Sequence, residues 1–129
     1  MKNYNFSGQA AITRSMLAWW AINYKDQALP KLSKDLNIEH LRKKGKIVNP
    51  GTYTMLGNQS LLEGKLQTSG APFDFPYKNK KYYSRSQIQE LKELSENNTN
   101  FDVKEIHQRT KKISESFIEF VLKNDLMNY

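Results

Sequence analysis

The spacing of apolar residues predicts a long helix near each end of the chain. In residues 8–25, apolar side chains recur at helical spacing and cover a wide face, which is typical of a packed helix. Residues 102–123 have an apolar face, and Asp102 supplies an acid cap with Glu105 three residues on. The apolar residues of this second face are Val103, Ile106, Ile113, Phe117, Phe120 and Val121.

Between these helices the pattern is shorter and mixed. Residues 36–41 alternate apolar and polar side chains, as a half-buried strand does. Residues 52–56 are rich in strand formers and precede a Gly-Asn break. Asn58 is well suited to cap a short helix that runs to about Gln67. The order strand, loop, strand, turn, helix predicts a ββα unit over about residues 36–68.

The last third of the chain is expected to be helical. Glycine and proline breaks in residues 68–83 predict an irregular loop with several lysines. Residues 84–87 fit a capping box, and a helical stripe of apolar residues follows them. We therefore expect one α+β domain over residues 1–129, mostly helical, with a helical C-terminal part over residues 84–123. The domain could also be the C-terminal module of a longer protein.

The composition is basic and lacks cysteine. Lys and Arg number 20 against 13 Asp and Glu, which gives a formal net charge of +7 and favours a polyanionic partner such as DNA. Without cysteine, a metal would be held by histidine, carboxylate or amide oxygen, which suits hard cations. No apolar run approaches the ~20 residues that span a bilayer. The N-terminus lacks the layout of a secretory signal, so we expect a cytoplasmic protein without a membrane partner.

The middle segment carries the side chains of a one-metal hydrolytic site. His40 is the candidate general base, because a neutral imidazole can take a proton from water. Glu39 and Gln67 are the candidate ligands of a divalent cation, Mg²⁺ or Mn²⁺. Neighbours on a strand point to opposite faces, so a bend or bulge must bring Glu39 and His40 together. Asn58 is expected to fix the loop around His40 through backbone hydrogen bonds.

Basic residues flank this segment and are candidates for contacts with DNA phosphates. They are Lys43, Lys44, Lys46, Lys65, Lys78, Lys80, Lys81 and Arg85. Each of them also has the simpler interpretation of a solvated basic surface. Farther along, Arg109 is expected to brace the fold through a carboxylate or a carbonyl, and His107 to be a surface or packing residue.

From about Asn37 to Val121 the chain resembles the C-terminal nuclease domain of GmrSD-type type IV restriction endonucleases, a His-Asn-His (ββα-metal) family. The segments that carry the resemblance, in order, are Ile38-Glu39-His40, Leu56 to Gln67, the lysine-rich Phe75 to Tyr83, and Ile106-x-x-Arg109. The resemblance implies a metal-dependent DNA endonuclease in which His40 is the catalytic histidine, Asn58 the central asparagine and Gln67 the last ligand. It also implies restriction of foreign or modified DNA, as in phage defence. A nucleotide-dependent N-terminal domain or a separate subunit is the implied protein partner.

Two departures from the family pattern define an alternative function. The Ile-Leu-Pro that usually follows the family's histidine is replaced by Leu41-Arg42-Lys43, and the last asparagine by Gln67, which is one methylene longer. A displacement of ~1 Å in a catalytic site can lower the rate around a hundredfold. The alternative is a degenerate domain that binds DNA or a protein partner without cleaving. A third interpretation is a basic helical interaction protein with no nucleic-acid role.

Overall fold

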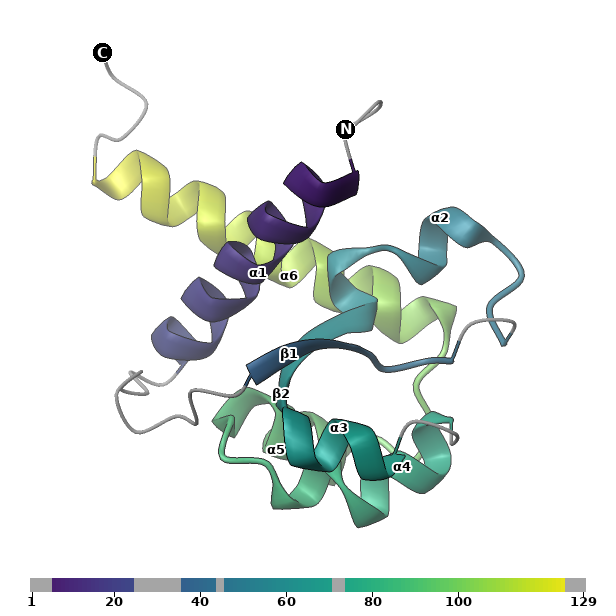
Figure 1. Cartoon of the computed structure of the whole chain (residues 1–129). Helices are drawn as coiled ribbons and strands as arrows, with labels where there is room; N and C mark the ends of the chain where they lie inside the picture. The colour runs from purple at the N-terminus through teal and green to yellow at the C-terminus, as the bar shows by residue number, and fades with distance from the viewer. Residues whose placement is uncertain (1–5, 25–35, 44–45, 71–73, 125–129) are drawn as a thin grey trace.

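The computed structural model of the chain describes residues 6–24, 36–43, 46–70 and 74–124. Within these ranges the fold is mostly helical with one small sheet (Figure 1), in agreement with the expected α+β class. The sheet pairs β1 (Leu36–His40) with β2 (Gln59–Glu63) in antiparallel register. None of the described helices is both long enough and apolar enough to cross a bilayer.

Six helices and two 3₁₀ turns surround the sheet within the described residues. They are α1 (Phe6–Asn23), α2 (Pro50–Tyr53), η3 (Leu56–Asn58), α3 (Gly64–Gly70), α4 (Phe75–Lys81), η4 (Tyr83–Arg85), α5 (Gln89–Asn97) and α6 (Val103–Lys123). The helices α3, α4 and α5 gather on one side of the sheet (Figure 1). The two long helices cross, and Trp19 of α1 contacts the rings of Phe117 and Phe120 on α6.

The two long helices lie close to where the sequence predicts them. α1 begins and ends two residues before the predicted range of 8–25. α6 begins with the expected acidic cap: Glu105 accepts a hydrogen bond from the Asp102 backbone N–H at 2.8 Å, and Asp102 accepts one in return. Ile106 and Ile113 on its apolar face are fully buried. Capping and apolar spacing therefore fix α6 locally.

The prediction of a strand at residues 52–56 is wrong. These residues form the end of α2 and the turn into η3. Asn49 starts α2, because its Oδ1 atom accepts a hydrogen bond from Gly51 N at 2.8 Å and Pro50 occupies the first turn. The second strand comes later, as β2, where the backbone finds its hydrogen-bond partners on β1. Tertiary pairing overrides strand propensity here.

The helix expected from Asn58 begins at Gly64 instead, and Asn58 caps no helix. Strand, strand and helix still follow one another over residues 36–70, and Gln67 lies on α3 as expected. Two further boundaries differ. The irregular loop predicted for residues 68–83 contains α4, which Asp74 precedes and Pro76 helps to start. Residues 84–87 form part of η4 and a turn, so α5 begins later than predicted.

The core is formed by apolar side chains from all of these elements. Its fully or nearly fully buried members include Leu17, Leu41, Leu61, Leu62, Phe75, Tyr83, Ile88, Leu91, Phe101 and Ile106. Leu41 follows directly after His40 and has no exposed surface, so it anchors the end of β1 in the core. The position of His40 is therefore fixed by hydrophobic packing of its neighbour.

Arg109 braces the fold from α6, as the sequence predicts. Its guanidinium forms a two-pronged ion pair with Glu90 of α5, at 2.9 Å to Oε2 and 2.7 Å to Oε1. Its Nη1 atom also donates to the backbone oxygens of Gly57, at 3.0 Å, and Gln59, at 2.7 Å. All of these groups are buried. One side chain thus ties α5 and α6 to the segment that enters β2.

Candidate functional site

His40 lies at the end of β1, half-buried, with its ring stacked on Tyr53. The two ring centroids are 4.4 Å apart and the ring planes differ by 4°. Burial lowers the pKa of His40 below its ordinary value; the Glu39 carboxylate opposes this shift, and the Lys78 ammonium adds to it. The imidazole is therefore mostly neutral near pH 7, and a neutral imidazole is the form that can accept a proton.

Asn58 holds the backbone that follows His40 and the backbone of Tyr53, whose ring stacks on His40. Its Oδ1 atom accepts a hydrogen bond from Arg42 N at 2.9 Å, and its Nδ2 atom donates to Tyr53 O at 2.9 Å. Its own carbonyl accepts from Leu41 N at 2.8 Å. These are the backbone bonds expected of Asn58. The side chain has no exposed surface, so it positions the loop and the stacked tyrosine and does not touch a substrate.

Gly57 allows this segment to approach α6 closely. A Cβ atom at Gly57 would lie 2.0 Å from Ile106 O and 2.5 Å from Thr110 Oγ1. The Gly57 N–H donates to Thr110 Oγ1 at 2.8 Å. Only glycine fits at this contact. The Gly-Asn pair is therefore required by packing against α6 as well as by the loop after His40.

Glu39 points away from His40. The pairing of β1 with β2 continues without a bulge from Leu36 to His40, so neighbouring side chains alternate between faces. The bend expected to bring the two residues together is therefore absent from this strand. The Glu39 carboxylate is buried, and its Oε2 atom accepts hydrogen bonds from Lys78 Nζ and Tyr83 Oη, each at 2.7 Å.

Gln67 and Glu39, the two candidate metal ligands, do lie side by side. The Gln67 Nε2 atom is 3.4 Å from Glu39 Oε1 and donates to Ile38 O at 2.7 Å. The fold therefore assembles the pair of side chains from β1 and α3. Lys78 completes the group, since its Nζ atom also donates to the backbone oxygen of His40 at 3.1 Å.

This arrangement does not fit a divalent cation. Glu39 Oε2 is occupied by an ammonium and a phenol hydroxyl, and Gln67 presents its amide N–H, not its oxygen, to Glu39. A cation placed at the carboxylate would lie close to the Lys78 charge, and like charges repel strongly in a buried site. Among the described residues, no cluster of three or more His, Asp or Glu side chains could hold a metal ion.

Most of the basic residues that the sequence predicts to contact phosphates lie on the surface. The exposed members are Lys43, Lys46, Lys65, Lys80, Lys81 and Arg85, and Lys44 lies outside the described residues. The prediction for Lys78 is wrong, because the residue is only 4 % exposed and its side chain is paired with Glu39. Arg42, which the sequence analysis did not select, is held by Asp74 at 3.2 Å and by Asp102. His107 is exposed on α6, as expected.

The role of Lys78 had a signal in the sequence. α4 buries Phe75, Lys78 and Asn79, and Tyr82 is buried just after it. Lys78, Asn79 and Tyr82 lie three, four and seven residues after Phe75, which is the spacing of one helix face. Lys80 and Lys81 fall on the opposite, exposed face. Once residues 75–81 are known to form a helix, their positions around its axis therefore distinguish the buried Lys78 from the exposed Lys80 and Lys81.

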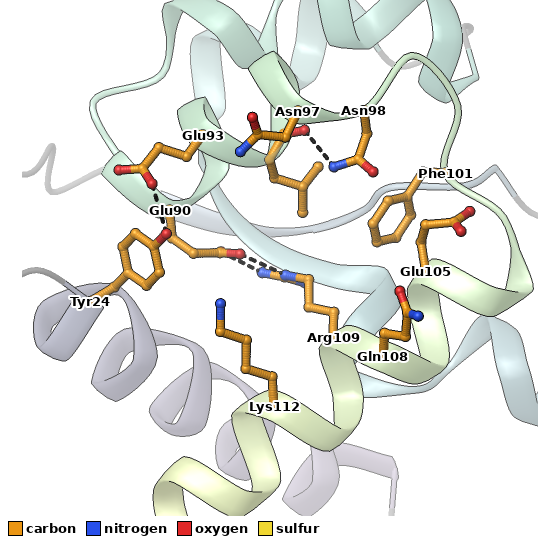
Figure 2. Close-up of a pocket in the computed structure, with 11 residues that line it drawn as sticks. Tyr24, Glu90, Glu93, Asn97, Asn98, Phe101, Glu105, Gln108, Arg109 and Lys112 are labelled. Carbon is orange, nitrogen blue, oxygen red and sulfur yellow. Dashed lines mark hydrogen bonds and ion pairs between the residues drawn. The ribbon is translucent and has the colours of Figure 1, made fainter.

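A separate pocket of about 220 Å³ lies between α5 and α6, away from His40 (Figure 2). The Glu90–Arg109 ion pair forms one wall, and Tyr24 donates to Glu93 Oε1 at 2.8 Å on another. Burial and Glu93 raise the pKa of Tyr24 to about 12. Arg109 is the one lining residue that the sequence analysis names among its candidate site residues, and its expected role is to brace the fold.

Comparison of the chain with protein-family profiles, with curated proteins and with solved structures gives no match.

Proposed function

We propose that the chain is a DNA endonuclease domain of the His-Asn-His class, with His40 as its general base. The observation that carries this proposal is the state of His40. Its ring is half-buried at a strand end, its pKa is lowered, and Asn58 fixes the backbone that follows it and the stacked Tyr53. A neutral imidazole held in one orientation supports proton transfer from an attacking water.

Exposed lysines that follow the two strands support a polyanionic substrate. Lys43 and Lys46 follow β1, and Lys65 lies in the first turn of α3 next to the sheet. Their exposed ammonium groups supply positive charge for the DNA backbone, which dominates affinity without reading sequence. Restriction of foreign or modified DNA is the role implied by the resemblance to the GmrSD-type nuclease domain.

A divalent cation, Mg²⁺ or Mn²⁺, would stabilise charge on the phosphate in this class of enzyme. Since Glu39 and Gln67 do not fit such an ion as arranged, no step of the proposed reaction runs through it. His40 removes the proton from water, and the exposed lysines orient the phosphate backbone.

The second candidate function is a module that binds DNA or a protein partner without cleaving. The observation that favours it is the buried Lys78–Glu39 ion pair, which occupies a proposed metal ligand. In this case His40 and its basic surroundings form a binding surface only.

Incubation of supercoiled plasmid with the purified chain tests these functions. The reactions contain Mg²⁺, Mn²⁺ or EDTA, and a parallel gel shift measures DNA affinity at increasing salt. The endonuclease proposal predicts nicked plasmid and an affinity that falls as salt rises, because phosphate contacts release counterions. Binding without nicking supports the second candidate. Binding that is absent, or unchanged by salt, contradicts both DNA-based proposals.

The cleavage rate is expected to depend on pH through His40. The base acts in its neutral form, and its pKa lies below the ordinary 6.5, so the rate should be level at neutral pH. It should fall only as the pH drops through this lowered pKa, where His40 becomes protonated. A profile of kcat/KM against pH on a labelled duplex measures this. A rate that falls by half at or above pH 6.5 would contradict the environment described for His40.

A further inference from the structure

Lys78 is a buried cation surrounded by oxygen atoms. The residue is 4 % exposed, and its Nζ atom lies 2.7 Å from Glu39 Oε2 and 3.1 Å from the backbone oxygen of His40. The ammonium also lies 5.7 Å from the centre of the Tyr83 ring, within the range of a cation–π contact. Carboxylate and backbone oxygens are the groups that a hard metal ion also prefers.

We infer that the Lys78 ammonium is the resident cation of this site, and that it excludes a divalent ion from Glu39 and Gln67. The inference rests on the proposed function only for the choice of Mg²⁺ or Mn²⁺ as the excluded ion. It holds whether or not the chain cleaves DNA. It also explains why the candidate ligands lie together and yet do not fit a metal.

Burial makes this ion pair persistent. Glu39 and Lys78 have 7 % and 4 % of their surface exposed, so solvent screens their attraction little. Opening the pair would leave each buried charge without its opposite charge, which is unfavourable. A divalent ion must therefore displace the ammonium in competition with its hydrogen bonds to Glu39 and His40. Dissolved Mg²⁺ is also reluctant to lose its water.

Tyr83 and Gln67 show what remains when the ammonium is removed. Tyr83 Oη still donates to Glu39 Oε2, and the Gln67 amide still lies against Glu39 Oε1. The carboxylate then has no cation beside it. A divalent ion becomes the available counterion, with Glu39 and the His40 carbonyl as oxygen sources. If Lys78 only stabilised the core, its removal would not create affinity for a divalent ion.

The test is Mn²⁺ binding to the full chain, measured by electron paramagnetic resonance of the free ion, for the wild type and for Lys78→Met. We expect Lys78→Met to bind one Mn²⁺ at least about tenfold more tightly than the wild type, because a like charge has been removed from the site. Lys80→Met is the matched control, since it removes the same charge from an exposed position on the same helix. It should bind Mn²⁺ as the wild type does.

Two results would overturn the inference. One is a folded Lys78→Met variant, checked by circular dichroism, that binds Mn²⁺ no better than Lys80→Met. The other needs no variant: Mn²⁺ added to the wild type broadens amide NMR signals near the bound ion. Broadening centred on Glu39 and Gln67 at submillimolar Mn²⁺ would show that Lys78 does not exclude the ion. Wild-type spectra without such localised broadening support the inference even if Lys78→Met fails to fold. Neither measurement depends on DNA cleavage, so failure here is distinct from failure of the proposed function.

Discussion

Replacing Gly57 by alanine is expected to destabilise the domain by about 3 kcal/mol or to prevent its folding. The added methyl would lie 2.0 Å from Ile106 O and 2.7 Å from Thr110 N, so α6 or the Gly-Asn segment must shift. Such a shift would lengthen the hydrogen bonds from Gly57 N to Thr110 and from Arg109 to Gly57 O. Urea unfolding followed by circular dichroism measures the loss.

Gly51→Ala is the matched control for this experiment. A Cβ atom at Gly51 meets only Asn49 Oδ1, at 3.1 Å, and the residue is exposed. We expect its effect to stay below about 1 kcal/mol. Equal stability of the two variants would mean that the Gly57 backbone does not pack against α6 as described.

Replacing His40 by alanine is expected to lower plasmid nicking about 10²- to 10⁴-fold, the usual contribution of a general base. His40 has the lowered pKa and the fixed orientation that proton abstraction requires, and exposed basic residues lie nearby in the chain. Initial rates of nicking, at a protein concentration that saturates the DNA, separate this effect from weakened binding.

The control for His40→Ala is His107→Ala. His107 is exposed on α6, so its removal should leave the nicking rate unchanged. The His40 variant also loses the stack with Tyr53, so its fold must be verified by circular dichroism. A folded His40→Ala variant that nicks plasmid at the wild-type rate would remove His40 from the mechanism.

The parts of the fold that follow from local chemistry were predicted from the sequence. The capping residues Asp102 and Glu105 start α6 as expected, and β1 occupies residues 36–40 of the predicted 36–41. Arg109 braces buried carbonyls and a carboxylate, also as expected. These features depend on spacing and on residue type within a few positions, which a single sequence displays directly.

The second strand was misplaced because its position depends on a distant partner. Residues 52–56 have strand-forming side chains, but Asn49 and Pro50 start a short helix there. Residues 59–63 become β2 because they pair with β1, some twenty positions earlier in the chain. The Asn49-Pro50 start signal is present in the sequence, but the same residues are equally common in simple turns.

The sequence predicts which residues belong to the candidate site better than it predicts how they are arranged. Asn58 makes the expected backbone hydrogen bonds, whereas Glu39 and Gln67 lie side by side but do not fit the expected cation. The catalytic role of His40 stays a prediction. The regular course of β1 and the burial of Lys78 depend on packing that residue spacing alone does not specify. A lysine within three residues of two other lysines favours a surface interpretation until the phase of its helix is known.

The stack of His40 on Tyr53 gives the domain an intrinsic spectroscopic signal for the ionisation of His40. Parallel rings with centroids 4.4 Å apart place the imidazole protons in the shielding region of the phenol ring. Their NMR signals should lie upfield of those of the exposed His107 and can be followed separately during a titration. Protonation would bring a full positive charge onto the tyrosine face and alter its emission. The ionisation state of His40 can thus be followed in the unlabelled protein before any DNA is added.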